Sequence, residues 1–163
     1  MIKKKEEIFA FIDSQNINLG TQSDGWKLDW GKFRLFLMNK YQVTRIFFFI
    51  GYISKNKKLY KYLQNLGYIL IFKNVLSVRK DNETTYKGNV DAELVMHTMI
   101  QINNFDKAII ISGDGDFFCL IEYLEANKKL LKVITPNSKY SSLIRRYSSY
   151  IYNLYVFRNK LSR

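Results

Sequence analysis

The sequence predicts an α/β fold in which a mainly parallel sheet of about five or six strands carries helices on both faces. Short apolar runs rich in β-branched and aromatic residues recur along the chain, and segments with helical spacing separate them. Most of the runs are continuous rather than alternating, which is typical of strands buried on both sides. A chain of 163 residues can bury such a sheet within one domain, so we expect a single domain over residues 1–163.

In the first half of the chain, apolar runs alternate with one-sided helical patterns. Asp13 stands directly at the end of the first apolar run, IFAFI, and a polar segment that we expect to be a turn follows it. Asp29 is a candidate helix cap, and Gly67 is placed to end a basic helix because glycine tolerates a left-handed backbone. After a charged lead-in over 1–7, the expected elements are a strand at 8–12, a turn and loop at 14–25, a helix at 28–39, a strand at 44–50, a helix at 54–66 and a strand at 68–72.

In the second half, residues 73–89 are the least regular part, and we expect a basic loop there with a short strand at 75–78. A helical pattern then begins near Asp91, an acid that suits the positive end of a helix dipole. The remaining expected elements are a helix at 90–103, a strand at 107–111, a helix at 117–126, a strand at 131–135, a short helix at 141–147, a strand at 150–157 and a basic tail at 158–163.

The charge balance predicts a polyanionic partner. The chain has 26 Lys and Arg against 14 Asp and Glu, a net charge of +12, although lysines also serve simply to solvate a surface. Nucleic acid is favoured over a membrane, because no apolar segment approaches the roughly 20 residues of a span and no signal-peptide core follows residues 1–7. We therefore expect RNA, single-stranded or structured, as partner, no membrane association and a cytoplasmic location; a homodimer is compatible with the sequence.

The counts of cysteine and histidine restrict the metal chemistry. A single cysteine, Cys119, excludes an internal disulfide and a cysteine-based zinc site, and we expect it to be a core residue. A single histidine, His97, excludes a site built from several imidazoles. Oxygen ligands remain, and they favour Mg²⁺ or Mn²⁺.

Acidic residues follow two of the expected strands and begin one expected helix. Asp13 ends the first strand, Asp114 and Asp116 follow the strand at 107–111 in the segment SGDGD, and Asp91 begins the helix before it. The carboxyl ends of parallel strands meet at one sheet edge, where ligands bind, so the four acids are expected to converge there. Each acid has a simpler explanation as a turn or cap residue, but a shared carboxylate cluster explains all four together.

Carboxylates that hold a divalent cation inside a basic protein suit hydrolysis of a phosphodiester. Asn16 is a candidate to orient water or phosphate, and the Ser112 hydroxyl to bond Asp114 or the substrate. A haloacid-dehalogenase-type phosphatase needs an acid where the chain has Gln15, and a Toprim-type site expects glutamate in place of Asp13. The candidate contacts to the nucleic-acid backbone are basic residues in four segments: Lys87, Arg79, Lys80, Lys55, Lys58, Arg145 and Arg146.

Three segments, IFAFIDSQNI, KGNVDAEL and AIIISGDGDFFCLIEYL, resemble the NYN domain, the LabA-like branch of the PIN-like nucleases, in order and spacing. The resemblance covers roughly residues 8–154, and SGDGDF is its most specific part. It implies a three-layer, PIN-like fold of Rossmann-like type, an acidic metal site and action on RNA. On this match the metal-binding acids are Asp13, Asp91, Asp114 and Asp116, with Asn16 as a supporting polar group.

The chain departs from that family at three places. The family often has an acid six positions after the VD aspartate, where this chain has His97, and commonly has glycine where this chain has Ser14. An Ala-Asp pair near the end is replaced by Ser148 and Ser149. The leading hypothesis is a metal-dependent ribonuclease. Because a neutral imidazole suits Mg²⁺ poorly, the alternative is an RNA-binding PIN-like module with weak or lost catalysis.

Overall fold

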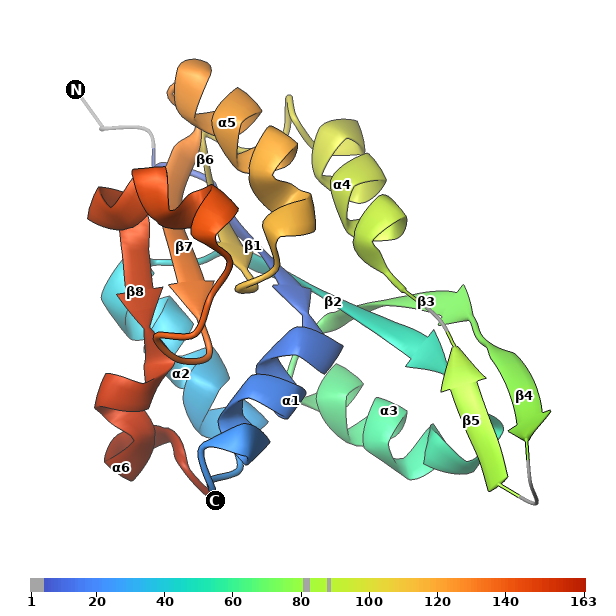
Figure 1. Ribbon diagram of the computed structural model, residues 1–163. Helices are drawn as coiled ribbons and strands as arrows, with labels where there is room; N and C mark the ends of the chain where they lie inside the picture. The colour runs from blue at the N-terminus through green and yellow to red at the C-terminus, as the bar shows by residue number, and fades with distance from the viewer. Residues whose placement is uncertain (1–4, 81–82, 88) are drawn as a thin grey trace.

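The protein is built around a six-stranded sheet in which every described strand pair is parallel (Figure 1). The computed structural model describes residues 5–80, 83–87 and 89–163, and the side chains of residues 5–77 and 89–163. The strand order is β3-β2-β1-β6-β7-β8. The strands are β1 (Ile8–Asp13), β2 (Arg45–Tyr52), β3 (Ile69–Asn74), β6 (Lys107–Ile111), β7 (Leu130–Thr135) and β8 (Ile151–Asn153).

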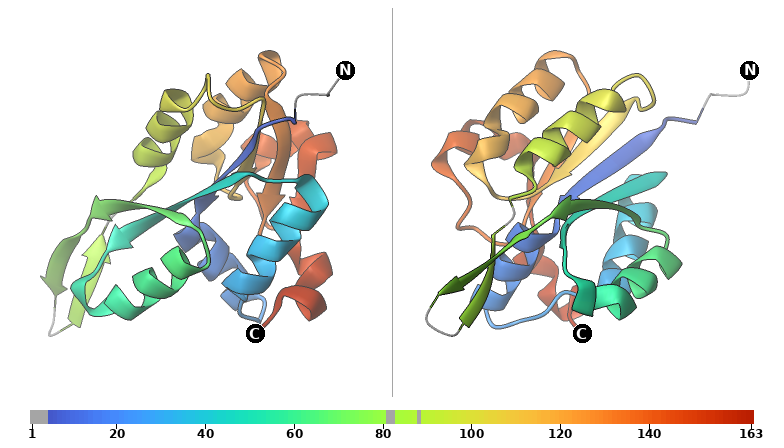
Figure 2. Two further views of the ribbon diagram at one scale, coloured as in Figure 1. Left: turned by 180° about the vertical axis from the view of Figure 1, so that it is seen from behind. Right: turned by 90° about the vertical axis from the view of Figure 1, so that its right-hand side faces the viewer.

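Helices cover both faces of this sheet, so the predicted three-layer α/β architecture is confirmed (Figures 1 and 2). Successive β1 residues face opposite layers: Ile8, Ala10 and Ile12 belong to one hydrophobic cluster, and Phe9 and Phe11 belong to the other. The first cluster contains residues of α1 (Ser14–Ser23), α2 (Trp30–Tyr41), α3 (Lys57–Asn65) and α6 (Arg158–Leu161), and the second contains residues of α4 (Asp91–Ile100) and α5 (Phe118–Ala126).

The strand order reverses between β1 and β6. From β1 the chain adds β2 and then β3 on one side, and from β6 it adds β7 and then β8 on the other. Residues 8–12 of β1 pair in register with residues 107–111 of β6, so both strands end at the same level. In open parallel sheets this is the position where ligands bind. Asp13 and the segment beginning at Ser112 therefore meet at the reversal point.

The segment after β1 is an α-helix, α1, and the expected turn and loop at 14–25 were wrong. The Asp13 carboxylate caps α1 by accepting a hydrogen bond from the Asn16 N–H at 3.2 Å. Gly20 lets the helix pack closely, because a Cβ at that position would lie 2.3 Å from Pro136 Cγ. The helix escapes a search for apolar periodicity because only Ser14, Ile17 and Thr21 are buried on it.

Four further expectations need correction. The expected short strand at 75–78 is present as β4 (Leu76–Lys80), but the rest of the expected loop contains a second strand, β5 (Glu83–Lys87). The two strands form an antiparallel hairpin that projects beyond the sheet on the β3 side (Figure 2). The expected last strand is limited to β8, and a 3-10 helix, Leu154–Phe157, follows it. The expected helix at 141–147 is a 3-10 helix over Ser142–Tyr150. Cys119 is exposed, not part of the core.

Two more 3-10 helices each lead directly into an α-helix. Ser54–Asn56 precedes α3, and Gly115–Phe117 precedes α5. Among the described residues, no helix combines the length and apolar composition that crossing a bilayer requires. The single domain over residues 1–163, the homodimer and the cytoplasmic location stay predictions.

Candidate metal centre

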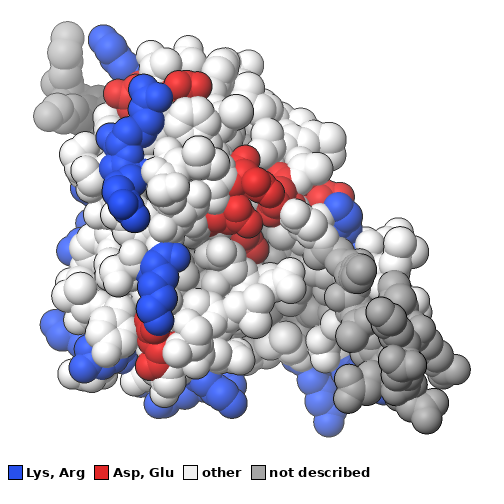
Figure 3. All heavy atoms as spheres, viewed as in Figure 1, with Lys and Arg blue, Asp and Glu red and all other residues white. Residues whose placement is uncertain are grey.

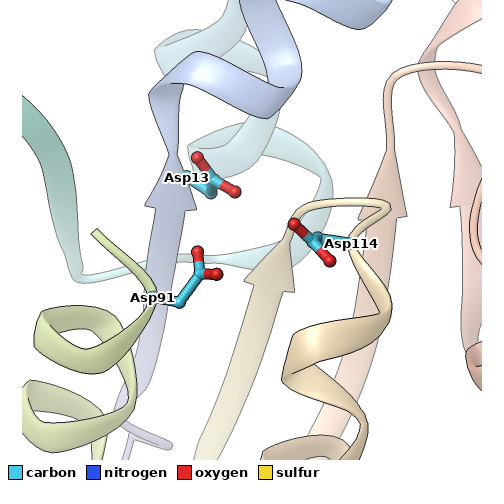
Figure 4. A group of neighbouring side chains, drawn as sticks. All are labelled: Asp13, Asp91 and Asp114. Carbon is cyan, nitrogen blue, oxygen red and sulfur yellow. The ribbon is translucent and has the colours of Figure 1, made fainter. Parts of the chain in front are cut away.

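Three of the predicted acids lie together at the reversal point of the sheet. Asp13, Asp91 and Asp114 each direct a carboxylate oxygen into a common space, and these oxygens lie within 4.8 Å of one another. Figure 4 shows the three side chains pointing toward one another from the end of β1, the start of α4 and the loop after β6. Like charges at this separation repel, so the arrangement favours a bound cation or protonation of one carboxylate.

Asp13 is held by two hydrogen bonds that fix its orientation. Its Oδ1 accepts from the Asn16 N–H, and its Oδ2 accepts from the Ser112 hydroxyl at 3.1 Å. The residue is only 4% exposed. Burial raises its pKa from 3.8 to about 6, and the neighbouring charges of Asp91 and Asp114 add to this effect, while the two hydrogen bonds oppose it. The Asp13 carboxyl group therefore loses its proton near pH 6.

The loop after β6 is fixed by side chains of the Asp13 segment. Gly113 N–H donates to Asn16 Oδ1 at 2.8 Å, and Asp114 N–H donates to the Ser112 hydroxyl at 3.1 Å. Because Ser112 donates to Asp13 and accepts from Asp114, its hydroxyl couples the two carboxylate-bearing segments. The predicted partnership of Ser112 with Asp114 is present, though through the backbone N–H and not the carboxylate.

The glycine between the two aspartates of SGDGD has a steric reason. Gly115 is buried, and a Cβ at this position would lie 2.3 Å from Ser141 Oγ and 3.0 Å from Ser141 Cβ. Its neighbour Asp114 caps the 3-10 helix by accepting a hydrogen bond from the Asp116 N–H at 3.0 Å. A side chain at position 115 would therefore require either Ser141 or the turn that carries Asp114 to shift.

Asp91 has a carboxylate oxygen without a hydrogen-bond partner. Its N–H donates to Asn89 Oδ1 at 2.7 Å, whereas its Oδ2 is buried and accepts no hydrogen bond from the described part of the chain. Burial raises the pKa of Asp91, and the charges of Asp114 and Asp116 raise it further. A buried acceptor left unpaired is costly, and a cation would satisfy it. The donor set, three carboxylates without nitrogen or sulfur ligands, fits a hard divalent cation.

The other residues predicted near the site differ in their positions. Asp116 is exposed and outside the group of three, but close enough to Asp91 to raise its pKa. The His97 ring packs edge-on against Phe49 with centroids 5.8 Å apart, and it is not part of the carboxylate group found among the described residues. Glu93 forms an ion pair with Lys73 at 3.2 Å. Glu93, like His97, is not part of the group of three carboxylates.

Two supporting residues were not anticipated in these roles. Asn89 orients Asp91 through the Asx-type hydrogen bond described above; an Asn two residues before a helix-starting Asp is the sequence signal for it. Ser14 donates its hydroxyl to the Phe49 carbonyl at 2.8 Å in the interior, which ties α1 to β2 directly beside Asp13. The departure from glycine at position 14 thus adds a buried hydrogen bond.

The predicted backbone-contact residues whose side chains are described lie at the surface. Lys55, Lys58 and Arg145 are exposed, and Arg146 pairs with Glu122 at 3.8 Å while stacking over Phe118. The side chains of Arg79, Lys80 and Lys87 lie outside the described residues, as do residues 1–4 of the predicted lead-in. On the face shown in Figure 3, acidic atoms form one central patch, neutral atoms border most of it, and basic side chains lie mainly toward the margins.

Comparisons with known families, protein sequences and solved structures agree with the motifs and with the observed fold. The family model of the NYN domain matches residues 7–155. The low amplitude and bright protein LabA from Synechococcus elongatus is 22% identical over 152 residues, covering 89% of this chain and 82% of that protein. The crystal structure of a protein of unknown function from Vibrio parahaemolyticus has a similar fold, with a TM-score of 0.73, 23% identity and coverage of 89% of this chain and 91% of the other. The chain therefore belongs to the NYN domain family of PIN-like nucleases, as its motifs predicted.

Proposed function

We propose that this protein is a metal-dependent ribonuclease that hydrolyses RNA phosphodiester bonds at the carboxyl edge of its sheet. The observation that carries the proposal is the convergence of Asp13, Asp91 and Asp114, with an Asp91 oxygen buried and unpaired. Membership of a nuclease family and a net charge of +12 support a polyanionic substrate. Mg²⁺ or Mn²⁺, held by these three aspartates, would draw charge from the phosphate and acidify an attacking water.

The residues of the chain have separate tasks in this proposal. Asp13, Asp91 and Asp114 bind the cation, and Asp13 must first lose its proton. Ser112 is a positioning residue, because both hydrogen bonds of its hydroxyl are used within the site. The Oδ1 of Asn16 is engaged by Gly113, which leaves its amide NH₂ as the group that donates to a phosphate oxygen.

Asp116 completes the proposed set from the solvent side. Its carboxylate is exposed near Asp91, where it can contribute to cation binding or accept a proton as water attacks. Lys55, Lys58, Arg145 and Arg146, which are exposed, are proposed to contact the RNA backbone. Arg79, Lys80 and Lys87, on the β4–β5 hairpin, are proposed for the same role.

The test is cleavage of labelled single-stranded RNA with Mn²⁺ or Mg²⁺ by the wild type and by Asp13→Asn and Asp116→Asn. Glu125→Gln, a carboxylate-to-amide change at an exposed position of α5 outside the site, is the matched control. We expect metal-dependent cleavage by the wild type and the control, with a loss of at least about 100-fold in Asp13→Asn. Equal cleavage by all four proteins would overturn the assignment.

A second candidate is an RNA-binding module without turnover. It is favoured by His97, which packs on Phe49 where the family often carries an acid, so the described site holds three close carboxylates. In this case RNA binding persists and weakens steeply with salt, while neither metal produces cleavage. Cleavage that depends on Asp13 excludes this candidate.

A further inference from the structure

A hollow of about 280 Å³ lies beside the carboxylates, between α1, the carboxyl end of β2 and the start of α3. Ser14, the residue that follows Asp13, is part of its wall. Ligand pockets in proteins commonly measure about 300–1,000 Å³, so this hollow suits a single ring system and not a larger ligand. Its occupant would lie next to the proposed cleavage site.

The lining of the hollow is uncharged. Three side-chain amides, Gln15, Asn18 and Asn56, come from α1 and from the 3-10 helix before α3. Apolar side chains, including Leu19 and Leu59, supply the rest of the wall. No charged residue belongs to the lining among the residues that the structure describes. In a protein of net charge +12, such a surface favours a neutral, partly apolar ligand over a phosphate.

The three amides are available to a ligand. Within the described residues, the hydrogen bonds of this region involve none of the side-chain amides of Gln15, Asn18 and Asn56, and Asn56 makes no capping bond to α3. Each amide offers both a donor and an acceptor. Paired donors and acceptors beside apolar side chains are what recognises the edge and faces of a nucleobase.

A second hollow of about 280 Å³ on the other side of α1 has a charged residue in its lining and amides that are already hydrogen-bonded. It contains Lys139, and its Asn137 amide is already used: Nδ2 donates to the Gly20 carbonyl, and Oδ1 accepts from the Lys139 N–H. Its Asn16 Oδ1 is engaged by Gly113. Of these two hollows, the first combines an uncharged wall with three available amides.

We propose that the hollow formed by Gln15, Asn18, Asn56, Leu19 and Leu59 binds one unpaired base of a single-stranded RNA. The inference rests on the proposed function for the identity of the polymer, and it adds a site that selects the nucleotide beside the cleaved bond. Lys55 and Lys58 are exposed and adjacent in sequence to Asn56 and Leu59, so they are placed to hold phosphates of the same strand.

The test measures binding without metal, so that it does not depend on cleavage. Fluorescence anisotropy compares single-stranded homopolymeric RNA with abasic RNA of the same length and charge, in EDTA and at fixed salt. We expect wild type to bind at least one base-containing RNA about tenfold more tightly than abasic RNA. The double variant Asn18→Leu/Asn56→Leu should lose this advantage and keep its affinity for abasic RNA.

Asn65→Leu is the matched control, because Asn65 is an exposed asparagine at the opposite end of α3 and does not line the hollow. It should retain the tenfold advantage. If the double variant fails to fold, the side-chain NH₂ resonances of Asn18 and Asn56 in wild type replace it, and these should shift on addition of a nucleoside monophosphate.

The outcomes separate this proposal from the proposed function. Equal affinity of wild type for abasic and base-containing RNA, an unchanged advantage in the double variant, or NH₂ resonances that do not shift would each overturn the base site. Any of these results leaves Asp13-dependent cleavage intact. Conversely, a base advantage that is lost in the double variant establishes the base site even if no cleavage occurs.

Discussion

At Asp13 the requirements of cation binding and of folding stability conflict. Its carboxylate is buried at the end of β1, next to two other carboxylates, and its pKa in the folded protein is raised from 3.8 to about 6. Above pH 6 the folded protein without metal must therefore hold a desolvated negative charge. The stability that a protonated Asp13 contributes is fully present below about pH 4 and is lost as the pH rises through about 6.

Replacing Asp13 by asparagine should stabilise the metal-free protein at pH 7. The raised pKa corresponds to roughly 1–3 kcal/mol of unfolding free energy at pH 7. Asparagine Oδ1 can still accept the Asn16 N–H, whereas its NH₂ group cannot accept the Ser112 hydroxyl, so part of this gain is lost. Thermal unfolding in EDTA is the measurement, and the gain should disappear at pH 4. A lower Tm than wild type at pH 7 would contradict the assigned cause of the pKa shift.

Cation affinity should rise with pH through about 6. The Asp13 carboxylate must be ionised to bind a cation, so protons and Mn²⁺ compete for it, and binding releases protons. Calorimetric titration with Mn²⁺ at pH 5 and pH 7, in buffers of different ionisation enthalpy, measures both affinity and proton release. Affinity that is independent of pH over this interval would exclude Asp13 as a ligand.

Removing the Ser112 hydroxyl should weaken cation binding without removing a ligand. Ser112→Ala loses the hydrogen bond to Asp13 and leaves the Asp114 N–H without its acceptor, so both carboxylates lose a constraint. Loss of such an orienting partner costs roughly 10–100-fold in metal affinity. The same titration checks this, with the exposed Ser148→Ala as control; equal affinities in both variants would show that Ser112 does not position the site.

At the scale of single elements, the turn between β6 and α5 depends on close packing at Gly115. In Gly115→Ala the new Cβ would lie 2.3 Å from Ser141 Oγ and 3.0 Å from Ser141 Cβ, so either Ser141 or the turn that carries Asp114 must shift. We expect a lower Tm, about 1–3 kcal/mol of lost stability, together with weaker Mn²⁺ binding. Gly25→Ala is the comparison: Gly25 has φ +78°, but a Cβ added there would meet no atom within 4 Å, so this variant should lose stability alone.

The strands that contain continuous apolar runs are predictable from the sequence. The other elements depend on contacts with segments that lie elsewhere in the chain. β1, β2, β6 and β7 lie where their apolar runs lie, because both faces of these strands meet helices. β3 also lies at its apolar run, although it is an edge strand in which no residue is fully buried. α1 lacks such a signal, since its helical state depends on its Asp13 cap and on the contact of Gly20 with Pro136, which lies far along the chain. The β4–β5 pairing likewise requires a partner strand that local composition does not reveal.

Sequence and sheet topology together predict which residues come to the site, but not how their side chains are arranged. Asp13, Asp91 and Asp114 each stand at the end of an element that a parallel sheet brings to one edge, and they meet as expected. Side-chain rotamers and exposure are not determined in this way. For that reason the sequence does not reveal that Asp116 stays at the surface, that His97 packs on Phe49, or that Asn89 holds Asp91.

At the scale of the whole molecule, the net charge of +12 should make RNA binding strongly dependent on salt. Each phosphate contacted by Lys or Arg releases condensed counterions, and log K falls with log salt by roughly 0.7 per contact on a single strand. For about four contacts, affinity should fall roughly 50-fold between 50 and 200 mM salt. Anisotropy titrations across this range provide the measurement, and a flat response would exclude contact with the RNA backbone.

The pairing of β1 with β6 also determines when the carboxylate cluster can form during synthesis of the chain. Asp13 and Ser112 are 99 residues apart in sequence, and the two strands must pair before the carboxylates can share a cation. A nascent chain on the ribosome therefore cannot assemble the three-carboxylate cluster until β6 has left the exit tunnel, and a fragment that ends before β6 never acquires it. Under the proposed function, the order of the strands therefore delays RNA cleavage until the ribosome has translated and released β6.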